Sequence, residues 1–258
     1  MDFTIEELSM EGWPSLYTFL YDGWIIRLSN GYGNRSNSVN PIYRSKKILE
    51  EKFQYCDELF SSYNLPVTYK LIGCEEHDYL EKKLEDMKFN KINETSVQVC
   101  DLSEKKDEDF KRSHGEGIII SNRFNESWTE AVIKFNGIEE KHIATFRKIL
   151  DNIAGEKIVV QKEINGRVLG CGNGVIGRGY VGIFDVVVEK SWRGKGYGRE
   201  IVETILFEAK KRGAEKSYLQ VMLNNHAALS LYKKLGYKEM YQYWYRKKSA
   251  SKTLNDNF

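Results

Sequence analysis

The sequence has no large charge of one sign, no long apolar run and no paired cysteines. Among its 258 residues, 39 basic side chains are balanced by 37 acidic ones, and the formal net charge is +2. Such a surface offers no broad positive field to hold a nucleic acid or an anionic membrane. We therefore expect neither of them as a partner.

Signals for export or membrane insertion are also missing. No stretch approaches the roughly 20 apolar residues that a membrane-spanning helix needs. The first thirty residues contain five acidic side chains and no basic segment followed by an apolar core, which a secretory signal requires. We expect a cytoplasmic protein.

The cysteines stand singly, at Cys56, Cys74, Cys100 and Cys171. There is no CxxC pair and no histidine at ligand spacing, so we expect no metal site. Nothing near any of the four marks an activated thiol, and we interpret them as reduced, mostly buried side chains.

The C-terminal half contains a clear alternation of strands and helices. Two strand-forming segments meet at the Asn165-Gly166 turn, and an amphipathic segment stops at Gly213. The predicted elements are strands at Lys157–Ile164, Val168–Ile176 and Tyr180–Val188, a helix at Arg199–Arg212, a strand at Ser217–Leu223, a helix from Asn224 or Asn225 to about Gly236, and a strand around Tyr241–Tyr245. Two further helices precede them, one opened by a capping box at Ser127–Glu130 and one over Glu139–Ile153.

The N-terminal half repeats this order more faintly. The predicted elements are a strand at Gly23–Ser29, a glycine-containing loop, a helix at Ser45–Tyr63, a strand at Val67–Ile72, a helix at Glu76–Met87 and a strand at Phe89–Leu102. The segment from Tyr79 to Ile92 is laid out like that from Leu231 to Met240. We interpret the halves as a degenerate duplication, although short helices rich in Lys and Leu also match by chance.

One hexapeptide between the apolar strand and the amphipathic helix carries the chemistry, Arg193-Gly194-Lys195-Gly196-Tyr197-Gly198. Its glycines let the backbone turn sharply and bring N–H groups close to a ligand, and the first helical turn adds unpaired donors and the positive end of the dipole. Arg193, Lys195 and Arg199 add the positive charge that a pyrophosphate requires. Taken alone, the hexapeptide equally suits an ordinary strand-to-helix turn with solubilising charges.

Two other nucleotide-binding motifs fit this segment less well. A Rossmann loop has the spacing GxGxxG and an acidic residue at the end of the next strand, but here the spacing is GxGxG and that strand carries Tyr218, Gln220 and Met222. A Walker loop needs GxxxxGK followed by Ser or Thr, whereas Tyr197 lies two residues after Lys195. A nicotinamide-dependent oxidoreductase is therefore disfavoured.

Together with a second motif, the hexapeptide resembles the GNAT superfamily of N-acetyltransferases. The R/Q-x-x-G-x-G/A pattern of the family is matched at Arg193, Gly196 and Gly198. About thirty residues on, its N-x-x-A-x-x-x-Y element is matched at Asn225, Ala228 and Tyr232, followed by Leu235-Gly236-Tyr237. The resemblance covers roughly Gly117 to Lys248. It implies an α/β fold with the mixed central sheet of acyl-CoA N-acyltransferases.

The resemblance also implies a role for each matched position. The backbone of Val186, Val187 and Val188 would pair with the pantetheine arm of acetyl-CoA. Its pyrophosphate would be enclosed by Arg193, Gly194, Lys195, Gly196, Tyr197, Gly198 and Arg199. Asn225, in the motif that it shares with Ala228, would hydrogen-bond the pantetheine, and Tyr232 would protonate the leaving thiolate. A helix N-cap at Asn225 and a core aromatic at Tyr232 are the structural alternatives.

Acetyl transfer also needs a group that takes the proton from the amine. Asp185 is an acidic residue in an otherwise apolar strand, next to the matched valines, where burial would raise the pKa of its carboxyl group. We select Asp185 as the base. The alternative is a carboxylate that only accepts backbone hydrogen bonds, and Glu189 and Glu126 are rivals.

The N-terminal half has Asn30-Gly31-Tyr32-Gly33-Asn34-Arg35 where we expect its counterpart of the hexapeptide. It resembles the degenerate half of two-lobed members of the superfamily, and we expect it not to bind CoA. Its segment Asp22–Val39 either contributes to an acceptor pocket or only packs against the other half. We divide the chain into a degenerate lobe (1–103), a charged linker (104–116), a catalytic lobe (117–248) and a flexible tail (249–258).

The sequence thus predicts an enzyme that moves acetyl from acetyl-CoA, as co-substrate, to a primary amine of a small molecule or peptide. Transfer would occur by direct attack and without a metal. The alternative is a catalytically silent module that binds or senses acyl-CoA. The sequence names neither the acceptor nor the oligomeric state.

Overall fold

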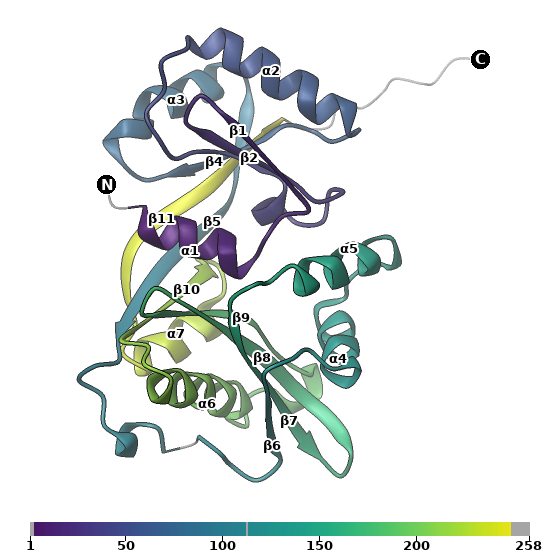
Figure 1. Cartoon of the computed structure of the whole chain (residues 1–258), viewed down its shortest axis with the longest axis vertical. Helices are drawn as coiled ribbons and strands as arrows, with labels where there is room; N and C mark the ends of the chain where they lie inside the picture. Colours follow the sequence, from purple (N-terminus) through teal and green to yellow (C-terminus); the bar gives the residue numbers. More distant parts are fainter. Residues whose placement is uncertain (1–2, 112, 249–258) are drawn as a thin grey trace. The chain divides into compact units, whose positions relative to one another are not determined.

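In a computed structural model, which describes residues 3–111 and 113–248, the chain forms two compact units (Figure 1). The first unit comprises Ser15–Thr95 and 242–248, and the second comprises 3–14 and Ser96–Tyr241. Each unit has a hydrophobic core of its own. The predicted tail, 249–258, lies outside the described residues.

The first unit is a mixed sheet with two helices. Its elements are β1 (Tyr17–Tyr21), β2 (Trp24–Leu28), β3 (Ser38–Pro41), α2 (Leu49–Ser62), β4 (Thr68–Ile72), α3 (Glu75–Asp86) and the first part of β5 (Phe89–Asp101). Strands β1 to β3 are antiparallel, β3 and β4 are parallel, and β4 pairs with the last strand, β11 (Lys238–Lys248). The predicted strand and helix order of this half is confirmed, with β1 and β3 added to it.

Helix α3 contacts β11 through ion pairs with the buried Arg246. Glu81 accepts hydrogen bonds from Trp244 Nε1 at 2.9 Å and from Arg246 Nε at 3.1 Å. Burial alone would raise the pKa of Glu81, but the hydrogen bonds from Arg246 and Trp244 outweigh it, and the pKa lies below its usual value.

A lowered pKa makes this contact a source of stability that depends on pH. The contribution is complete well above pH 4.5 and is lost as the pH falls through the folded-state pKa. We expect Glu81→Gln to lower the melting temperature at pH 7, and the difference from the wild type to shrink as the pH drops below about 4. Calorimetry between pH 3 and 7 measures this. A difference that stays constant with pH would contradict the assignment.

The second unit is a larger mixed sheet with helices on both faces. Its strands are β6 (Ile118–Ser121), β7 (Glu156–Ile164), β8 (Arg167–Gly177), β9 (Tyr180–Val188) and β10 (Lys216–Met222). Its helices are α1 (Thr4–Gly12), α4 (Glu126–Asn136), α5 (Glu140–Asp151), α6 (Tyr197–Lys211) and α7 (His226–Lys234). Strands β6 to β9 are successively antiparallel, β9 and β10 are parallel, and β5 lies next to β10. This is the predicted mixed α/β sheet.

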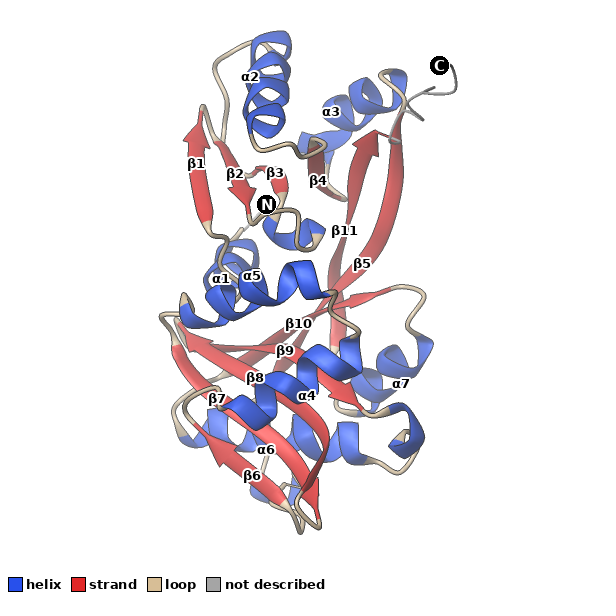
Figure 2. Cartoon of the chain, turned by 90° about the vertical axis from the view of Figure 1, so that its right-hand side faces the viewer, coloured by secondary structure: helices blue, strands red, loops and turns tan. Residues whose placement is uncertain are grey.

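Alternate glycines on β8 determine how closely α6 approaches the sheet. A Cβ atom added at Gly172 would lie 2.7 Å from Ile201 Cγ2, and one at Gly174 would lie 2.5 Å from Ile205 Cγ2. The opposite face of β8 is covered by α4, whose buried Trp128 donates from Nε1 to Val160 O at 3.1 Å. Figure 2 shows α4 in front of these strands and α6 behind them. Because α6 packs closely on β8, the start of α6 lies next to the end of β9.

The start of α4 differs from the prediction. Its N-cap is Asn125, whose Oδ1 accepts a hydrogen bond from Trp128 N at 2.8 Å. Ser127 lies inside the helix and donates to the same Oδ1 at 2.9 Å. The predicted capping box is therefore wrong, because an amide two residues upstream already satisfies the free N–H group.

Helix α1 was not predicted, and polar contacts secure it to the second unit. Glu6 is buried and accepts a hydrogen bond from Tyr241 OH at 2.7 Å. Gln220 donates from Nε2 to Ser9 Oγ at 2.8 Å. None of the described helices has the length and apolar character of a membrane span.

Candidate functional site

The hexapeptide forms the turn between β9 and α6. Gly194 has φ +79° and Gly196, the N-cap of α6, has φ +89° and ψ 0°. Both are left-handed conformations that side chains with a Cβ disfavour. The helix begins at Tyr197, and with glycine as its N-cap no side chain caps its free N–H groups.

The turn presents a run of unsatisfied backbone donors. Within residues 3–111 and 113–248, the N–H groups of residues 194–199 have no hydrogen-bond acceptor, and the first N–H of the helix start that is bonded belongs to Glu200, which donates to Gly196 O at 3.0 Å. Unpaired donors at a helix N-terminus bind anions, because the helix dipole adds to their partial charges. The geometry therefore fits a phosphate group.

The cations of the turn differ in how strongly they are engaged. Arg193 donates from Nε to Val188 O at 3.1 Å, and Lys195 Nζ lies 4.0 Å from the centre of the Trp192 ring. Arg199 Nε donates to the fully buried carboxylate of Glu203 at 2.6 Å. Arg193 and Lys195 therefore contribute most of the net positive charge, and Glu203 offsets that of Arg199.

Strands β9 and β10 separate next to this turn. Their parallel pairing runs from Tyr180–Lys216 to Ile183–Leu219 and ends there, although both strands continue. The register between β8 and β9 shifts at the same place, and Asp185 has φ +50°. This is a β-bulge, which bends β9 away from its neighbour. Backbone groups of 186–188 on the β10 side are consequently not paired with β10.

The second motif lies against the first. A Cβ atom added to Gly198 would lie 3.8 Å from both Leu231 Cδ2 of α7 and Val188 Cγ2 of β9. Asn225 is the N-cap of α7, and its Oδ1 accepts a hydrogen bond from Ala228 N at 3.2 Å. The structure thus brings the end of β9, the turn and α7 together. It also assigns a capping function to Asn225, which leaves the amide nitrogen for other contacts.

Tyr232 is a buried residue of α7. Its side chain is 8% exposed, and its ring meets the Tyr237 ring edge-on at 5.7 Å. Burial raises the pKa of Tyr232 to about 12, so the phenol stays protonated at neutral pH. A protonated phenol can donate a proton to a thiolate.

The three carboxylates considered as a base have different surroundings. Asp185 is half-buried in the bulge of β9. Glu189 accepts a hydrogen bond from Arg167 Nη2 at 2.5 Å. Glu126 is exposed at the start of α4, and hydrogen bonds from Arg147 hold its pKa below the usual value. A lowered pKa disfavours Glu126 as a base, since its carboxylate holds protons less readily.

Asn173 on β8 is an unpredicted polar residue near the bulge. It is fully buried opposite Phe184 of β9, and neither its side-chain nitrogen nor its oxygen has a partner within the described residues. A buried amide without partners costs stability. No sequence signal marks it, because its burial follows from strand register.

Replacing this amide by an apolar side chain should stabilise the protein. We expect Asn173→Val to raise the free energy of unfolding by about 1–3 kcal/mol, measured by urea denaturation. The matched control is Asn40, a buried asparagine of β3 that donates from Nδ2 to Ser38 O at 2.9 Å. Asn40→Val should lower stability. Equal losses at both positions would contradict this interpretation.

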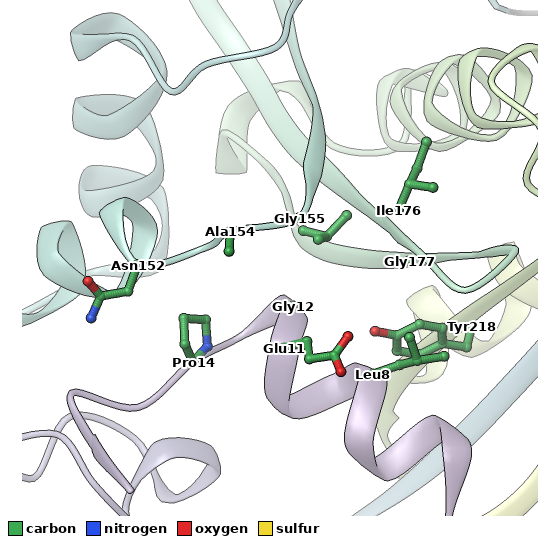
Figure 3. Close-up of a pocket in the computed structure, with 11 residues that line it drawn as sticks. Leu8, Glu11, Gly12, Pro14, Asn152, Ala154, Gly155, Ile176, Gly177 and Tyr218 are labelled. Atoms are coloured by element: carbon green, nitrogen blue, oxygen red, sulfur yellow. The ribbon is translucent and has the colours of Figure 1, made fainter.

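A cavity of about 260 Å³ lies elsewhere in the second unit (Figure 3). It is lined by Leu8, Glu11, Gly12, Pro14, Asn152, Ala154, Gly155, Val175, Ile176, Gly177 and Tyr218. Figure 3 shows the Glu11 carboxylate and the Tyr218 hydroxyl directed toward the same region. The lining residues of β8 pair with the first residues of β9, whereas the hexapeptide follows its last ones. The cavity is therefore separate from the glycine turn.

The glycines of the N-terminal half have a different role from the one expected. Gly31 and Gly33 lie between the antiparallel strands β2 and β3, not between a strand and a helix. Asn37 fills this connection: its Oδ1 accepts from Ser29 N and Gly31 N, and its Nδ2 donates to Gly33 O at 2.8 Å. The segment 30–35 is thus not the counterpart of the hexapeptide. That counterpart is the β3–α2 connection, residues 42–48.

No group of three or more potential metal-ligating side chains is found within the part of the chain that the structure describes. Cys56, Cys100 and Cys171 are buried, and burial raises the pKa of Cys56 and Cys171 to about 12. At neutral pH these two thiols are protonated and therefore poor nucleophiles.

Comparisons with known proteins agree with the family resemblance seen in the sequence. Residues 121–237 match the Acetyltransferase (GNAT) family. YobR, an uncharacterized N-acetyltransferase of Bacillus subtilis (strain 168), is 27% identical over 249 residues, which are 94% of this chain and 96% of YobR. A functionally unknown conserved protein from Staphylococcus epidermidis ATCC 12228 has a similar structure, with a TM-score of 0.67, 10% identity and coverage of 96% and 97%.

A tandem GNAT protein from the clavulanic acid biosynthesis pathway is also similar in structure. Its TM-score is 0.60 at 11% identity, and the match covers 83% of this chain and 76% of that protein. At such identities the likeness concerns the fold alone. It confirms the predicted acyl-CoA N-acyltransferase fold with two GNAT-like lobes.

Proposed function

Because residues 121–237 form a domain of the GNAT acetyltransferase family, we propose that the chain moves acetyl from acetyl-CoA to a primary amine by direct attack. One observation carries this proposal. Six consecutive N–H groups, 194–199, are without an acceptor in the described residues and lie together at the N-terminus of α6. The pyrophosphate of acetyl-CoA is an anion that would satisfy them.

The residues present fit the rest of the co-substrate as well. The backbone of Val186, Val187 and Val188 is free of β10 and can hydrogen-bond an extended pantetheine arm as a strand would. The amide nitrogen of Asn225 is available at the start of α7. When bound, acetyl-CoA supplies an activated thioester carbonyl next to these groups.

We propose that two side chains transfer protons during the reaction. Tyr232 holds its proton at neutral pH and would donate it to the departing thiolate sulfur. Asp185 lies in the bulge, where β9 leaves β10, and would accept the proton from the attacking amine. The ion pairs of Glu189 with Arg167 and of Glu126 with Arg147 make these carboxylates weaker candidates.

The same features support a proposal about which part of the chain is catalytic. We propose that 117–248 is the catalytic lobe and 1–103 a degenerate lobe without acyl-CoA, connected by 104–116. Supporting this division, the glycine turn, the separated strands and Tyr232 all lie in the second unit. The two units do not follow these bounds everywhere: residues 3–14 and 96–103 pack in the second unit, and 242–248 pack in the first.

The rival proposal is a module that binds acyl-CoA without transfer. Both are tested by release of free CoA from acetyl-CoA with a panel of amines: a polyamine, an aminoglycoside, a peptide N-terminus and a lysine side chain. Calorimetry with acetyl-CoA alone runs in parallel. Amine-dependent release supports the enzyme, binding without release from any amine supports the sensor, and absence of binding overturns both.

A further inference from the structure

The β3–α2 connection of the first unit corresponds to the glycine turn of the second. Both follow a strand that pairs in parallel with the next strand of its unit, and both precede a helix. The residues also correspond, since Tyr43-Arg44-Ser45-Lys46 is laid out like Trp192-Arg193-Gly194-Lys195. The N-terminal connection thus keeps two of the cations of the turn, and Glu50 stands where the turn has Arg199.

The N-terminal connection has no glycines, and its backbone takes another course. Ser45 and Lys47 stand where the other turn has Gly194 and Gly196, and neither has a positive φ. Its N–H groups are nevertheless bound to an anion. Lys46 N donates to the Asp22 carboxylate at 3.0 Å and Lys47 N donates to it at 2.9 Å.

Side chains complete the contacts of this carboxylate. Ser45 Oγ donates to Asp22 Oδ2 at 2.5 Å, and Lys52 Nζ donates to the same oxygen at 3.2 Å. Lys52 is fully buried and also donates to the Asp22 carbonyl and to Ser45 Oγ. Hydrogen bonds from Ser45 and Lys47 hold the pKa of Asp22 well below its usual value. The carboxylate is therefore charged at any physiological pH.

The turn between β1 and β2, which contains Asp22, lies against the β3–α2 connection. Asp22 and Gly23 form the two-residue turn between β1 and β2, with φ +44° and +80°. A Cβ atom at Gly23 would lie 2.4 Å from Arg44 O, so only glycine allows this approach. Tyr43 N also donates to Gly23 O at 2.9 Å. The hairpin turn is thus built to place a carboxylate against residues 45–47.

We propose that residues 44–47 and Lys52 form an anion-binding site in the N-terminal half, and that the carboxylate of Asp22 is its permanent occupant. The site has the same place between a strand and a helix as the turn that holds a pyrophosphate in the proposed function, on which the comparison rests. Because the Asp22 carboxylate already binds the N–H groups of Lys46 and Lys47, Ser45 Oγ and Lys52 Nζ, the N-terminal half takes no acyl-CoA. The chain binds one acetyl-CoA molecule, and loss of the Asp22 carboxylate opens a second anion site.

The test uses the full chain and inorganic pyrophosphate as the probe. Gly194→Val first disables the turn of the second unit. In this background we expect Asp22→Ala to gain one pyrophosphate site per chain in calorimetry, with affinity at least about tenfold above its parent. Asp22→Asn is the matched control, because its amide still fills the site and should gain no binding. In Asp22→Ala, Lys52 Nζ keeps its hydrogen bonds to the carbonyl of residue 22 and to Ser45 Oγ. Thermal melting checks that the variant folds.

Two results would overturn the proposal. One is a folded Asp22→Ala variant that binds pyrophosphate no better than its parent. The other needs no variant: two acetyl-CoA molecules bound per wild-type chain. Failure of the proposed function is distinct from both, because a second unit that binds no acetyl-CoA leaves the gain of a pyrophosphate site by Asp22→Ala unaffected.

Discussion

Gly194→Val is expected to weaken acetyl-CoA binding by at least about 100-fold while the protein stays folded. Gly194 has φ +79°, which a β-branched residue adopts only with strain. To relieve that strain the turn must change course, and the N–H groups of 194–199 then no longer converge. Loss of two charge-assisted hydrogen bonds, at about 1.5–3 kcal/mol each, accounts for the factor.

The chain offers a matched control at Gly213, which follows the end of α6. It has φ +87°, and like Gly194 it has no atom within 4 Å of an added Cβ. Gly213→Val therefore introduces the same backbone strain without touching the turn. It should lower stability as much as Gly194→Val and leave acetyl-CoA affinity unchanged in calorimetry. Equal affinities of the two variants would mean that the turn does not hold the pyrophosphate.

The sequence predicted elements well where one periodicity dominates. The apolar, β-branched runs of β7 to β9 and the apolar face of α6 appear within two residues of their predicted bounds. Helix α1 was missed because its buried residues mix the polar Glu6 and Ser9 with the apolar Ile5 and Leu8. Strand β3 was missed because it is short and two of its four buried residues, Ser38 and Asn40, are polar.

For the candidate site, the sequence located the glycine turn and Tyr232, because their residue types and spacing are local signals. It did not predict the bulge at Asp185 or the burial of Asn173, since both depend on how β8 and β9 pair. The counterpart turn in the N-terminal half was misplaced for a related reason. Gly31 and Gly33 resemble a ligand loop, but the strand before the helix is β3.

Tyr232→Phe is expected to lower kcat by about 100-fold or more and to leave acetyl-CoA binding unchanged. The substitution removes only the hydroxyl, so the buried ring keeps its packing. If a proton from this hydroxyl reaches the leaving thiolate, the variant must expel the thiolate without help. Steady-state kinetics with the best amine of the panel, together with calorimetry, separates the two quantities.

The control is Tyr237, the other buried tyrosine of the pair, whose hydroxyl lies 2.5 Å from Ser217 Oγ. Tyr237→Phe should lose about 1 kcal/mol of stability and keep kcat, because its hydroxyl is occupied within the core.

The pH dependence of kcat is a further test of the role of Tyr232. With burial raising the pKa of Tyr232 to about 12, its phenol stays protonated up to that pH, so wild-type kcat should not fall between pH 8 and 10 through its ionisation. A variant Tyr232→Phe as fast as Tyr237→Phe would assign the proton to solvent instead.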